Sequence, residues 1–425
     1  MVDLIVFEDA GWADLLPLTW WRAAFELRCG IDPLLAKIER ACGAAAGLFV
    51  RPELAETIAE RYAGRAVNAV SATRPALVVN GRMLFRGRDG GGSMSADPPD
   101  LPLGSAAWSA DGRTLLAAHV QSAYVNRLAP EALLDAERTR AWLGGTAEAA
   151  IPEESYELIA YPWHLVAANG TELERDIRAR TVGKPSEGGF RRPERNVLVE
   201  GDHPVALGRG ARIRAGAVLV AERGPILIDE EAVVSPNATI QGPCYVGPRS
   251  QIQPGAVIRE ATSIGPRCKV GGEVEGTIFQ GYSNKQHLGF LGHAFVGEWV
   301  NLGAGTVNSD LKNTYGTVRV RTARGTVDTG HMFVGAFIGD HAKTGINVAL
   351  PTGALIGFAA QVLADRPPNY VPSFTWLTDD GPARCDPSRA VEVARKVMGR
   401  REVELTAAGA RLFLGIAAAA ERMES

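Results

Sequence analysis

The chain has 425 residues, of which 46% are hydrophobic, and its formal net charge at pH 7 is −3. This length exceeds what one ordinary hydrophobic core accommodates, so we expect two or three domains. A nearly balanced, slightly acidic charge gives no support to a nucleic-acid partner or to binding at an anionic membrane surface. The apolar stretch at residues 412–420 is too short to span a bilayer, so no membrane partner is expected.

Cysteine usage and the N-terminus bear on the compartment. The five cysteines contain no CxxC pair. Two of them, Cys244 and Cys268, fall on positions that small residues occupy in the six-residue repeat described below, which continues to Val270. The opening nine residues lack the basic segment of a signal peptide and are typical of a first strand. The sequence therefore predicts free thiols in a reducing, cytoplasmic location.

Residues 1–115 alternate short apolar runs with segments of helical periodicity. We expect strands at 4–7, 47–50 and 76–80, and helices at 33–42 and 53–62. This rhythm is typical of an open, Rossmann-like α/β sheet. Residues 115–142 have helical periodicity with a junction at Pro130, residues 86–93 form a glycine-rich loop, and the Pro-, Gly- and Arg-rich residues 183–196 predict a linker between domains.

A six-residue repeat dominates the C-terminal half. Every sixth residue from Ile228 to Val270 is Ile or Val, and most residues two positions earlier are small. A period of six is too long for an α-helical turn and differs from the alternation of an ordinary strand. It is typical of a left-handed parallel β-helix, in which three hexads complete one coil. The repeat is interrupted at residues 273–295 and 307–331, and function is expected at these breaks.

The first interruption and the coil after it contain two motifs. Residues 283–292 read SNKQHLGFLG, and residues 300–306 read VNLGAGT. Together they resemble the acetyltransferase domain of the GlmU family of bifunctional glucosamine-1-phosphate acetyltransferases and N-acetylglucosamine-1-phosphate uridyltransferases. The resemblance implies acetyl-CoA as the acyl donor, an amino sugar as the acceptor, and a homotrimer with active sites between subunits. His287 is the expected catalytic base, since imidazole exchanges protons near neutral pH.

The same resemblance implies roles for further residues. The acceptor-binding candidates are Lys285, Phe290, Asn301, Glu275, Asp310 and Lys312, and the acetyl-CoA-binding candidates are Gly303, Ala304, Gly305 and Ala336. Phe290 stands where the family has Tyr, and Glu275 stands where it has a phosphate-binding Lys. Because a carboxylate repels a sugar 1-phosphate, the acceptor stays open among free, phosphorylated and nucleotide-linked amino sugars.

A third motif lies near the N-terminus, where residues 11–19 read GWADLLPLT, Arg22 follows, and residues 30–35 read GIDPLL. It resembles the opening of sugar-1-phosphate nucleotidyltransferases, which implies nucleotide-binding roles for Gly11, Asp14, Thr19 and Arg22. Asp14 stands where the family has the loop Arg, and Arg82 where it has an Mg²⁺-binding Asp, so Mg²⁺ is expected only if this domain is active. A rearranged site, to which Asp9, Asp14, Arg22 and Arg28 could contribute, and a domain that only binds its ligand are both open.

The predicted organisation has three parts: a sugar nucleotidyltransferase-like domain with a helical extension and linker at 1–195, a β-helix acyltransferase-like domain at 196–372, and a helical tail at 373–425. The leading hypothesis is a GlmU-like transferase acting on a sugar phosphate or nucleotide sugar. The alternatives are a single-activity nucleotidyltransferase whose β-helix serves oligomerisation, and a non-enzymatic scaffold that binds sugar nucleotides. No metal site is expected among His287, His293, His331 and His341, because none is five residues from another, the spacing of the zinc-binding pair in β-helical carbonic anhydrases.

Overall fold

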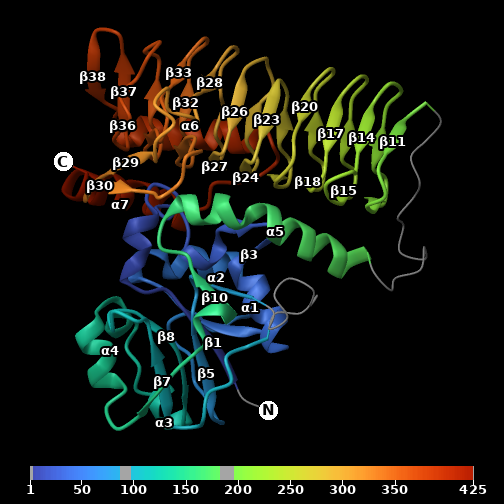
Figure 1. Ribbon diagram of the computed structural model, residues 1–425. Coiled ribbons are helices and arrows are strands. Elements are labelled where there is room, and N and C mark those ends of the chain that lie inside the picture. Colours follow the sequence, from blue (N-terminus) through green and yellow to red (C-terminus); the bar gives the residue numbers. More distant parts are fainter. Residues whose placement is uncertain (1–2, 87–96, 182–195, 425) are drawn as a thin grey trace. The chain divides into compact units, whose positions relative to one another are not determined.

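The structure is a computed structural model that describes residues 3–86, 97–181 and 196–424. The chain forms two compact units (Figure 1). The first comprises Met1–Leu15, Trp21–Leu27 and Asp32–Ala160, and the second comprises Leu16–Trp20, Arg28–Ile31 and Tyr161–Ser425. Most of the predicted glycine-rich loop at 86–93 and of the predicted linker at 183–196 lies outside the described residues.

The first unit is built on a six-stranded mixed sheet in the order β4-β1-β5-β8-β7-β9. Its strands are β1 (Asp3–Phe7), β4 (Ala46–Phe49), β5 (Ala76–Asn80), β7 (Ser105–Trp108), β8 (Leu115–Val120) and β9 (Ala147–Ala149). β1 pairs in parallel with β4 and β5, whereas β8 runs antiparallel to both β5 and β7. The predicted α/β sheet is therefore confirmed.

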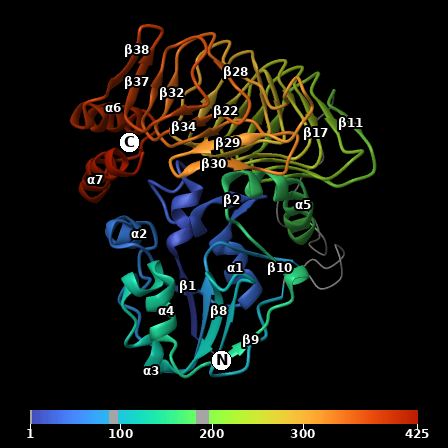
Figure 2. The same ribbon diagram turned by 60° about the vertical axis from the view of Figure 1, so that its left-hand side comes forward.

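Helices and short elements complete the first unit (Figure 2). The helices are α1 (Leu34–Cys42), α2 (Ala55–Arg61), α3 (Ser122–Val125) and α4 (Ala136–Trp142). The further strands are β3 (Asp32–Pro33), β6 (Met83–Phe85) and β10 (Tyr156–Leu158). Short 3₁₀ helices lie at Ala10–Leu15, Ala24–Glu26, Pro52–Leu54, Pro130–Leu134 and Glu153–Ser155. The helix predicted from residue 115 onward is wrong at its start, because β8 occupies that segment. A short continuous apolar run suits a buried strand and a buried helix alike, and only the pairing with β5 and β7 decides between them.

The second unit contains a parallel β-helix with three faces. The β26 face consists of β11 (Leu198–Glu200), β14 (Val218–Val220), β17 (Thr239–Gln241), β20 (Val257–Ile258), β23 (Glu273–Glu275) and β26 (Phe290–Gly292). The β27 face consists of β12 (Val205–Leu207), β15 (Ile226–Ile228), β18 (Cys244–Val246), β21 (Thr262–Ile264), β24 (Ile278–Gly281), β27 (Phe295–Glu298), β31 (Phe337–Ile338), β34 (Leu355–Ile356) and β36 (Tyr370–Val371).

The β25 face consists of β13 (Arg212–Ile213), β16 (Val233–Val234), β19 (Gln251–Ile252), β22 (Lys269–Val270) and β25 (Asn284–Lys285). Asn301 bridges β25 to the later strands of this face, which are β32 (Lys343–Thr344), β35 (Gln361–Val362), β37 (Thr375–Thr378) and β38 (Gly381–Arg384). β28 (Val307–Asn308) pairs with β33 (Ala349–Leu350). The prediction of a β-helix from the hexads is thus confirmed.

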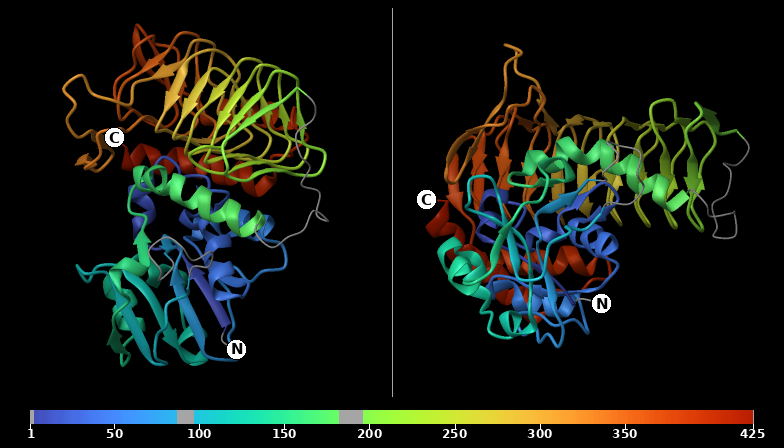
Figure 3. Two further views of the ribbon diagram at one scale, coloured as in Figure 1. Left: turned by 45° about the vertical axis from the view of Figure 1, so that its right-hand side comes forward. Right: turned by 60° about the horizontal axis from the view of Figure 1, so that its bottom comes forward.

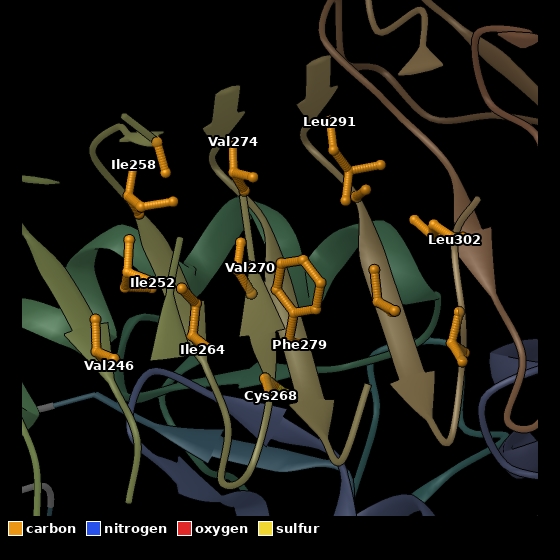
Figure 4. Packing of buried hydrophobic residues seen from close by; sticks show 14 of the residues in the cluster. Val246, Ile252, Ile258, Ile264, Cys268, Val270, Val274, Phe279, Leu291 and Leu302 are labelled. Carbon is orange, nitrogen blue, oxygen red and sulfur yellow. The ribbon is translucent and has the colours of Figure 1, made fainter. Parts of the chain in front are cut away.

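The aliphatic residues of the hexads form the core of the β-helix. Val234 pairs in register with Ile252, and Ile252 with Val270, so three hexads do complete one coil. Figure 4 shows Ile252, Ile264 and Val270 pointing into one stacked column. Each is fully buried, and burying such a side chain contributes about 1.5–3 kcal/mol. Cys244 and Cys268 are free and buried among them, as predicted.

The two interruptions of the repeat differ in kind. In the first, coiling continues through β23, β24, β25 and β26, but the coil is shorter, so that Val270 pairs with Lys285. In the second, the chain leaves the coil after β28 and forms an antiparallel hairpin of β29 (Arg319–Thr322) and β30 (Gly325–Asp328) before returning at β31. Only the second interruption is therefore an excursion from the β-helix.

Helices cover part of the second unit (Figure 3). α5 (Pro162–Thr181) places Leu173 and Ile177 against Leu227 and Tyr245 of the β27 face. The segment of Arg28–Ile31, which contains β2 (Arg28–Cys29), belongs to the same unit. The predicted helical tail forms α6 (Pro387–Gly399) and α7 (Ala407–Met423). Among the described residues, no helix combines the length and apolarity that crossing a bilayer requires.

Candidate functional site

Lys285 occupies a core position of the β25 face. It pairs in register with Val270 and is only 2% exposed. Its ammonium nitrogen donates hydrogen bonds to the carbonyl oxygens of Gly271, at 3.0 Å, and His287, at 2.8 Å. Lys285 therefore points into the prism, where it cannot serve as the predicted acceptor contact, and it instead anchors the corner that carries His287.

Two other inward polar residues anchor neighbouring segments. Thr344, in register with Val362, accepts a hydrogen bond from the Gly303 N–H at 2.9 Å, and its hydroxyl lies 2.7 Å from that of Thr306. The buried amide of Asn308 bonds both the N–H and the carbonyl of Gly292, at 2.8 and 2.9 Å. At this level of the β-helix, polar side chains therefore stand among the apolar residues of the core and bond to the backbone of neighbouring segments.

The corner residues after the β25 face stack on successive coils. The carbonyl of Leu288 accepts a hydrogen bond from the Gly305 N–H, and the carbonyl of Ala304 accepts one from Asn347. Gly305 has a φ of +75°, and a Cβ there would lie 2.2 Å from the Asn347 side-chain oxygen, so glycine is required. His287 is exposed at this edge. The edge thus brings His287 and the predicted glycine motif onto adjacent coils.

The outer surface of the β26 face carries two further predicted residues. The Arg259 guanidinium lies 2.8 Å from the Glu275 carboxylate and 3.4 Å from that of Glu273. Phe290, half-buried, turns its ring over Gly292, where a Cβ would lie 2.5 Å from the ring. Glu275 is thus engaged by a cation, and Phe290 forms an aromatic floor beside it.

Asn301 lies on the outer side of the β25 face. It bridges Asn284 and Lys343 along the face, and its side-chain oxygen is 3.3 Å from the Asn284 amide. Arg401, between α6 and α7, donates a hydrogen bond to the Asn284 oxygen at 2.6 Å. The helical tail therefore approaches the same face that displays Asn301, a contact that the sequence did not reveal.

A cavity of about 560 Å³ lies between the tail and the last coils of this face. Its lining includes Lys343, Gln361, Trp376, Cys385 and Arg389. Lys343 donates a hydrogen bond to the His341 carbonyl at 2.9 Å, and burial lowers the pKa of Lys343 to about 8. Sequence reasoning missed these residues. The tail matches no motif, and the six-residue repeat does not show whether an outward lysine such as Lys343 is exposed to solvent or covered by another element.

Three other predicted residues have different surroundings. Ala336 is fully buried in the apolar column, so its side chain does not face a coenzyme. Lys312 donates to the carbonyl of Thr317 at 2.9 Å and braces its own loop. Asp310 accepts a hydrogen bond from His293 at 2.8 Å. The Ala336 side chain is therefore part of the core, and Asp310 has His293 as its partner.

In the first unit, Asp9 and Arg82 form a buried ion pair. Arg82 binds both carboxylate oxygens of Asp9, at 2.7 and 2.6 Å, and the pair's side chains are only 4% and 11% exposed. Asn80 donates to the same carboxylate at 3.0 Å, and Arg82 also donates to the Ile159 carbonyl at 3.1 Å. A Cβ on Gly11 would lie 2.2 Å from the Arg82 guanidinium carbon. The guanidinium therefore fills the space directly over the predicted nucleotide-binding glycine.

These contacts do not suit Mg²⁺. The ion requires free carboxylate oxygens in an octahedral set, whereas both oxygens of Asp9 are taken up by Arg82. Within residues 3–86, 97–181 and 196–424, no group of three or more His, Cys, Asp or Glu side chains is placed to hold a metal ion. The residues around Asp9 therefore do not fit a Mg²⁺ ion.

The other predicted nucleotide-binding residues are spread over both units. Asp14 and Arg22 belong to the first unit with Gly11, whereas Thr19 falls in the segment Leu16–Trp20 of the second. Thr19 and Arg22 are buried, at 0% and 3% exposure. Arg28, offered as part of a rearranged site, belongs to the second unit, where its N–H bonds Gln280 at 3.0 Å. Arg28 therefore contacts the β-helix at Gln280.

The buried ammonium of Lys285 leads to a prediction on stability. Burial lowers its pKa from 10.5 to about 8, so between these pH values the unfolded chain binds more protons at this residue than the folded one. Its contribution to the free energy of unfolding should then rise with pH across this window. We expect wild type to gain stability over Lys285→Met between pH 8 and 10 in denaturant titrations. Lys269→Met, on the outer side of the same face, is the control, and parallel pH curves for wild type and Lys285→Met would contradict the prediction.

Comparisons with known proteins relate this chain to sugar nucleotidyl transferases and to bifunctional nucleotidylyltransferase/acetyltransferases. Residues 4–184 match the sugar nucleotidyl transferase family. The bifunctional sugar-1-phosphate nucleotidylyltransferase/acetyltransferase of Sulfurisphaera tokodaii is 36% identical over 143 residues, which cover 33% of this chain and 35% of that protein. The bifunctional protein GlmU of Thermotoga petrophila is 37% identical over 107 residues, 24% of this chain and 20% of its own. That of Methanococcus aeolicus is 34% identical over 85 residues, 20% of each. The matched regions thus span about a third or less of these relatives.

Proposed function

We propose that this chain, whose residues 4–184 match the sugar nucleotidyl transferases, is a GlmU-like transferase that acetylates an amino sugar with acetyl-CoA. The observation that carries the proposal is the corner at His287. The His287 side chain is exposed, and its backbone carbonyl accepts a hydrogen bond from the buried Lys285. The next residue, Leu288, is hydrogen-bonded to Gly305 of the adjacent coil. The named activities of the bifunctional relatives are in accord with it.

In the proposed reaction, His287 accepts a proton from the acceptor nitrogen as this nitrogen attacks the thioester carbon. A C–N bond forms, the C–S bond breaks, and the departing thiolate takes up a proton to give free coenzyme A. The donor lies along the edge where Leu288, 80% exposed, and Ile346, 67% exposed, flank Gly303, Ala304 and Gly305. In this proposal the acceptor lies on the β26 face, against the ring of Phe290 and beside Asp310, whereas Asn301 lies on the adjoining β25 face.

The first unit has a different proposed role. Its family match supports binding of a sugar phosphate or nucleotide sugar. The buried Asp9–Arg82 pair favours binding without Mg²⁺ over metal-dependent nucleotidyl transfer. The proposed enzyme is a cytoplasmic homotrimer. Exposed apolar side chains on the donor edge, Leu288 and Ile346, are suited to burial against another copy of the chain.

A mass-spectrometric screen tests the proposal. The protein is incubated with acetyl-CoA and glucosamine, glucosamine 1-phosphate or UDP-glucosamine, and separately with sugar 1-phosphates plus UTP or dTTP with and without Mg²⁺. We expect coenzyme A release and one acetylated amino sugar. Release of pyrophosphate with no acetyl transfer would favour the single-activity nucleotidyltransferase, and no product in either arm would favour the scaffold.

The charges on the β26 face predict the choice of acceptor. Two carboxylates surround Arg259, so the group carries net negative charge and disfavours a phosphate there. Glu275→Gln removes the carboxylate at 2.8 Å and leaves Arg259 with a weaker partner. We expect the KM for glucosamine 1-phosphate to fall about tenfold while that for glucosamine changes little. Glu273→Gln, at 3.4 Å, is the matched control with a smaller effect, and equal KM changes for the two acceptors would contradict the assignment.

A further inference from the structure

His293 and Asp310 form a hydrogen-bonded pair at the far end of β26 from His287. His293 follows β26 directly, and its Nδ1 lies 2.8 Å from a carboxylate oxygen of Asp310. The His293 side chain is 28% exposed and that of Asp310 is 14% exposed. A carboxylate at Nδ1 holds the N–H on that nitrogen and leaves the lone pair of the neutral ring on Nε2. The pair is therefore arranged as an oriented proton acceptor.

The surroundings of the pair fix its geometry. The His293 ring stacks on Phe333 with centroids 5.3 Å apart, and its other contact is Gly276, where a Cβ would lie 3.2 Å from Nε2. The Asp310 carboxylate lies over Gly292, where a Cβ would be 2.4 Å from the oxygen. Asp310 also accepts a backbone hydrogen bond from Val334 at 2.9 Å. A side chain at position 292 would displace the Asp310 carboxylate, and one at position 276 would crowd the His293 ring.

The pair and His287 lie at opposite ends of β26. Six residues separate His287 from His293, so at about 3.3 Å per residue the backbone between them spans up to about 20 Å. Phe290 and Gly292 are the outward residues of that strand, since Leu291 between them is fully buried. A sugar-sized acceptor seated on Phe290 would therefore lie between the two histidines.

The chemistry of the proposed reaction requires two deprotonations. An amino sugar enters as an ammonium ion, and its nitrogen must lose one proton to attack the thioester and another to become an amide. One proton balances the thiolate that leaves as coenzyme A, and the second passes to solvent. A single base must reset between the two transfers, whereas two bases on one surface need not.

We infer that His293, oriented by Asp310, is a second proton acceptor of the site and removes the first proton from the acceptor ammonium. This inference rests on the proposed function. The ammonium proton passes to His293 Nε2 and then to solvent, and the free amine attacks the thioester with His287 taking its remaining excess proton. The charged and titratable groups on the segments around His293 are Asp310, Lys312 and His331, and Glu275 with its partner Arg259.

The inference predicts a pH-dependent rescue. Between pH 6 and 9.5, kcat/KM is measured with acetyl-CoA and each of glucosamine, glucosamine 1-phosphate and UDP-glucosamine for wild type, His293→Gln, Asp310→Asn and His287→Gln. We expect His293→Gln to lose about 100-fold at pH 7 and to recover as pH rises, because solution then supplies the free amine. Asp310→Asn should lose less with the same recovery, and His287→Gln should show none. His331→Gln, exposed on the segment leading to Phe333, is the control.

The outcomes separate the inference from the proposed function. If wild type acetylates none of the three amines, both fail. If wild type acetylates one and His293→Gln keeps the wild-type rate, or loses rate by the same factor at every pH, the inference fails and the proposed function stands. Unfolding curves of each variant identify a loss that comes from a misfolded β26 corner, and Asp310→Asn then supplies the pH test without disturbing the histidine.

Discussion

Replacement of His287 by Gln is expected to lower kcat/KM for acetyl transfer by about 10²–10⁴-fold, the range that a positioned general base contributes. The free energy of unfolding should change little, because the His287 side chain is exposed. The corner is held by the hydrogen bond from the Lys285 ammonium to the His287 carbonyl, not by the imidazole. The measurement is the rate of coenzyme A release with the acceptor identified in the screen, alongside a denaturant titration.

A second variant distinguishes a base from a structural residue at this corner. His287→Gly leaves space for a small molecule, so added imidazole should restore part of its activity in a concentration-dependent manner. A structural role would not respond to imidazole. A rate for His287→Gln within a factor of two of wild type would contradict the assignment of His287 as the base, even if acetyl transfer itself were demonstrated.

Replacement of Arg82 by Met is expected to destabilise the first unit by about 3–5 kcal/mol. This is the cost of leaving one member of a buried ion pair without its partner, and the Asp9 side chain is only 11% exposed. The charge would be left between β1 and the Asn80 amide, 3.0 Å away. Hydrogen-exchange mass spectrometry of peptides from β1 and β5 measures the effect in that unit, separately from the β-helix.

The matched control removes both charges. Asp9→Leu with Arg82→Met replaces the pair by apolar side chains, a change that is often neutral or stabilising for buried ion pairs. We expect the double variant to recover most of the lost protection. If Arg82→Met alone exchanges as slowly as wild type, the pair is not the buried, mutually compensating contact described here.

The sequence predicted the fold well where one physical rule governs each position. The hexads specify a buried aliphatic residue on every face of every coil, and Val234, Ile252 and Val270 pair as that rule requires. The parallel β1, β4 and β5 followed from apolar runs between helical segments. The β8 segment was mistaken for a helix because its apolar run has no period that separates the two structures.

The motifs predicted the site residues, but not the directions of their side chains. Lys285, two residues before His287, points inward, and Ala336 is part of the core. The direction of Lys285 depends on the shortened coil that pairs it with Val270, and no local pattern in the sequence predicts that shift of register. From the sequence, His293 was considered only as a metal ligand, because its partner Asp310 lies 17 residues later, just after β28.

The sequence by itself determined the β-helix, the α/β sheet and the corner where chemistry is expected, because periodicity and motif spacing are local properties. The tertiary structure alone decided which side chains share that corner. The fold of the β-helix brings Asp310 beside His293, and sheet formation buries Arg82 against Asp9. Such contacts join residues far apart in the chain, and their strength depends on burial, which only the folded packing of the coils and strands sets.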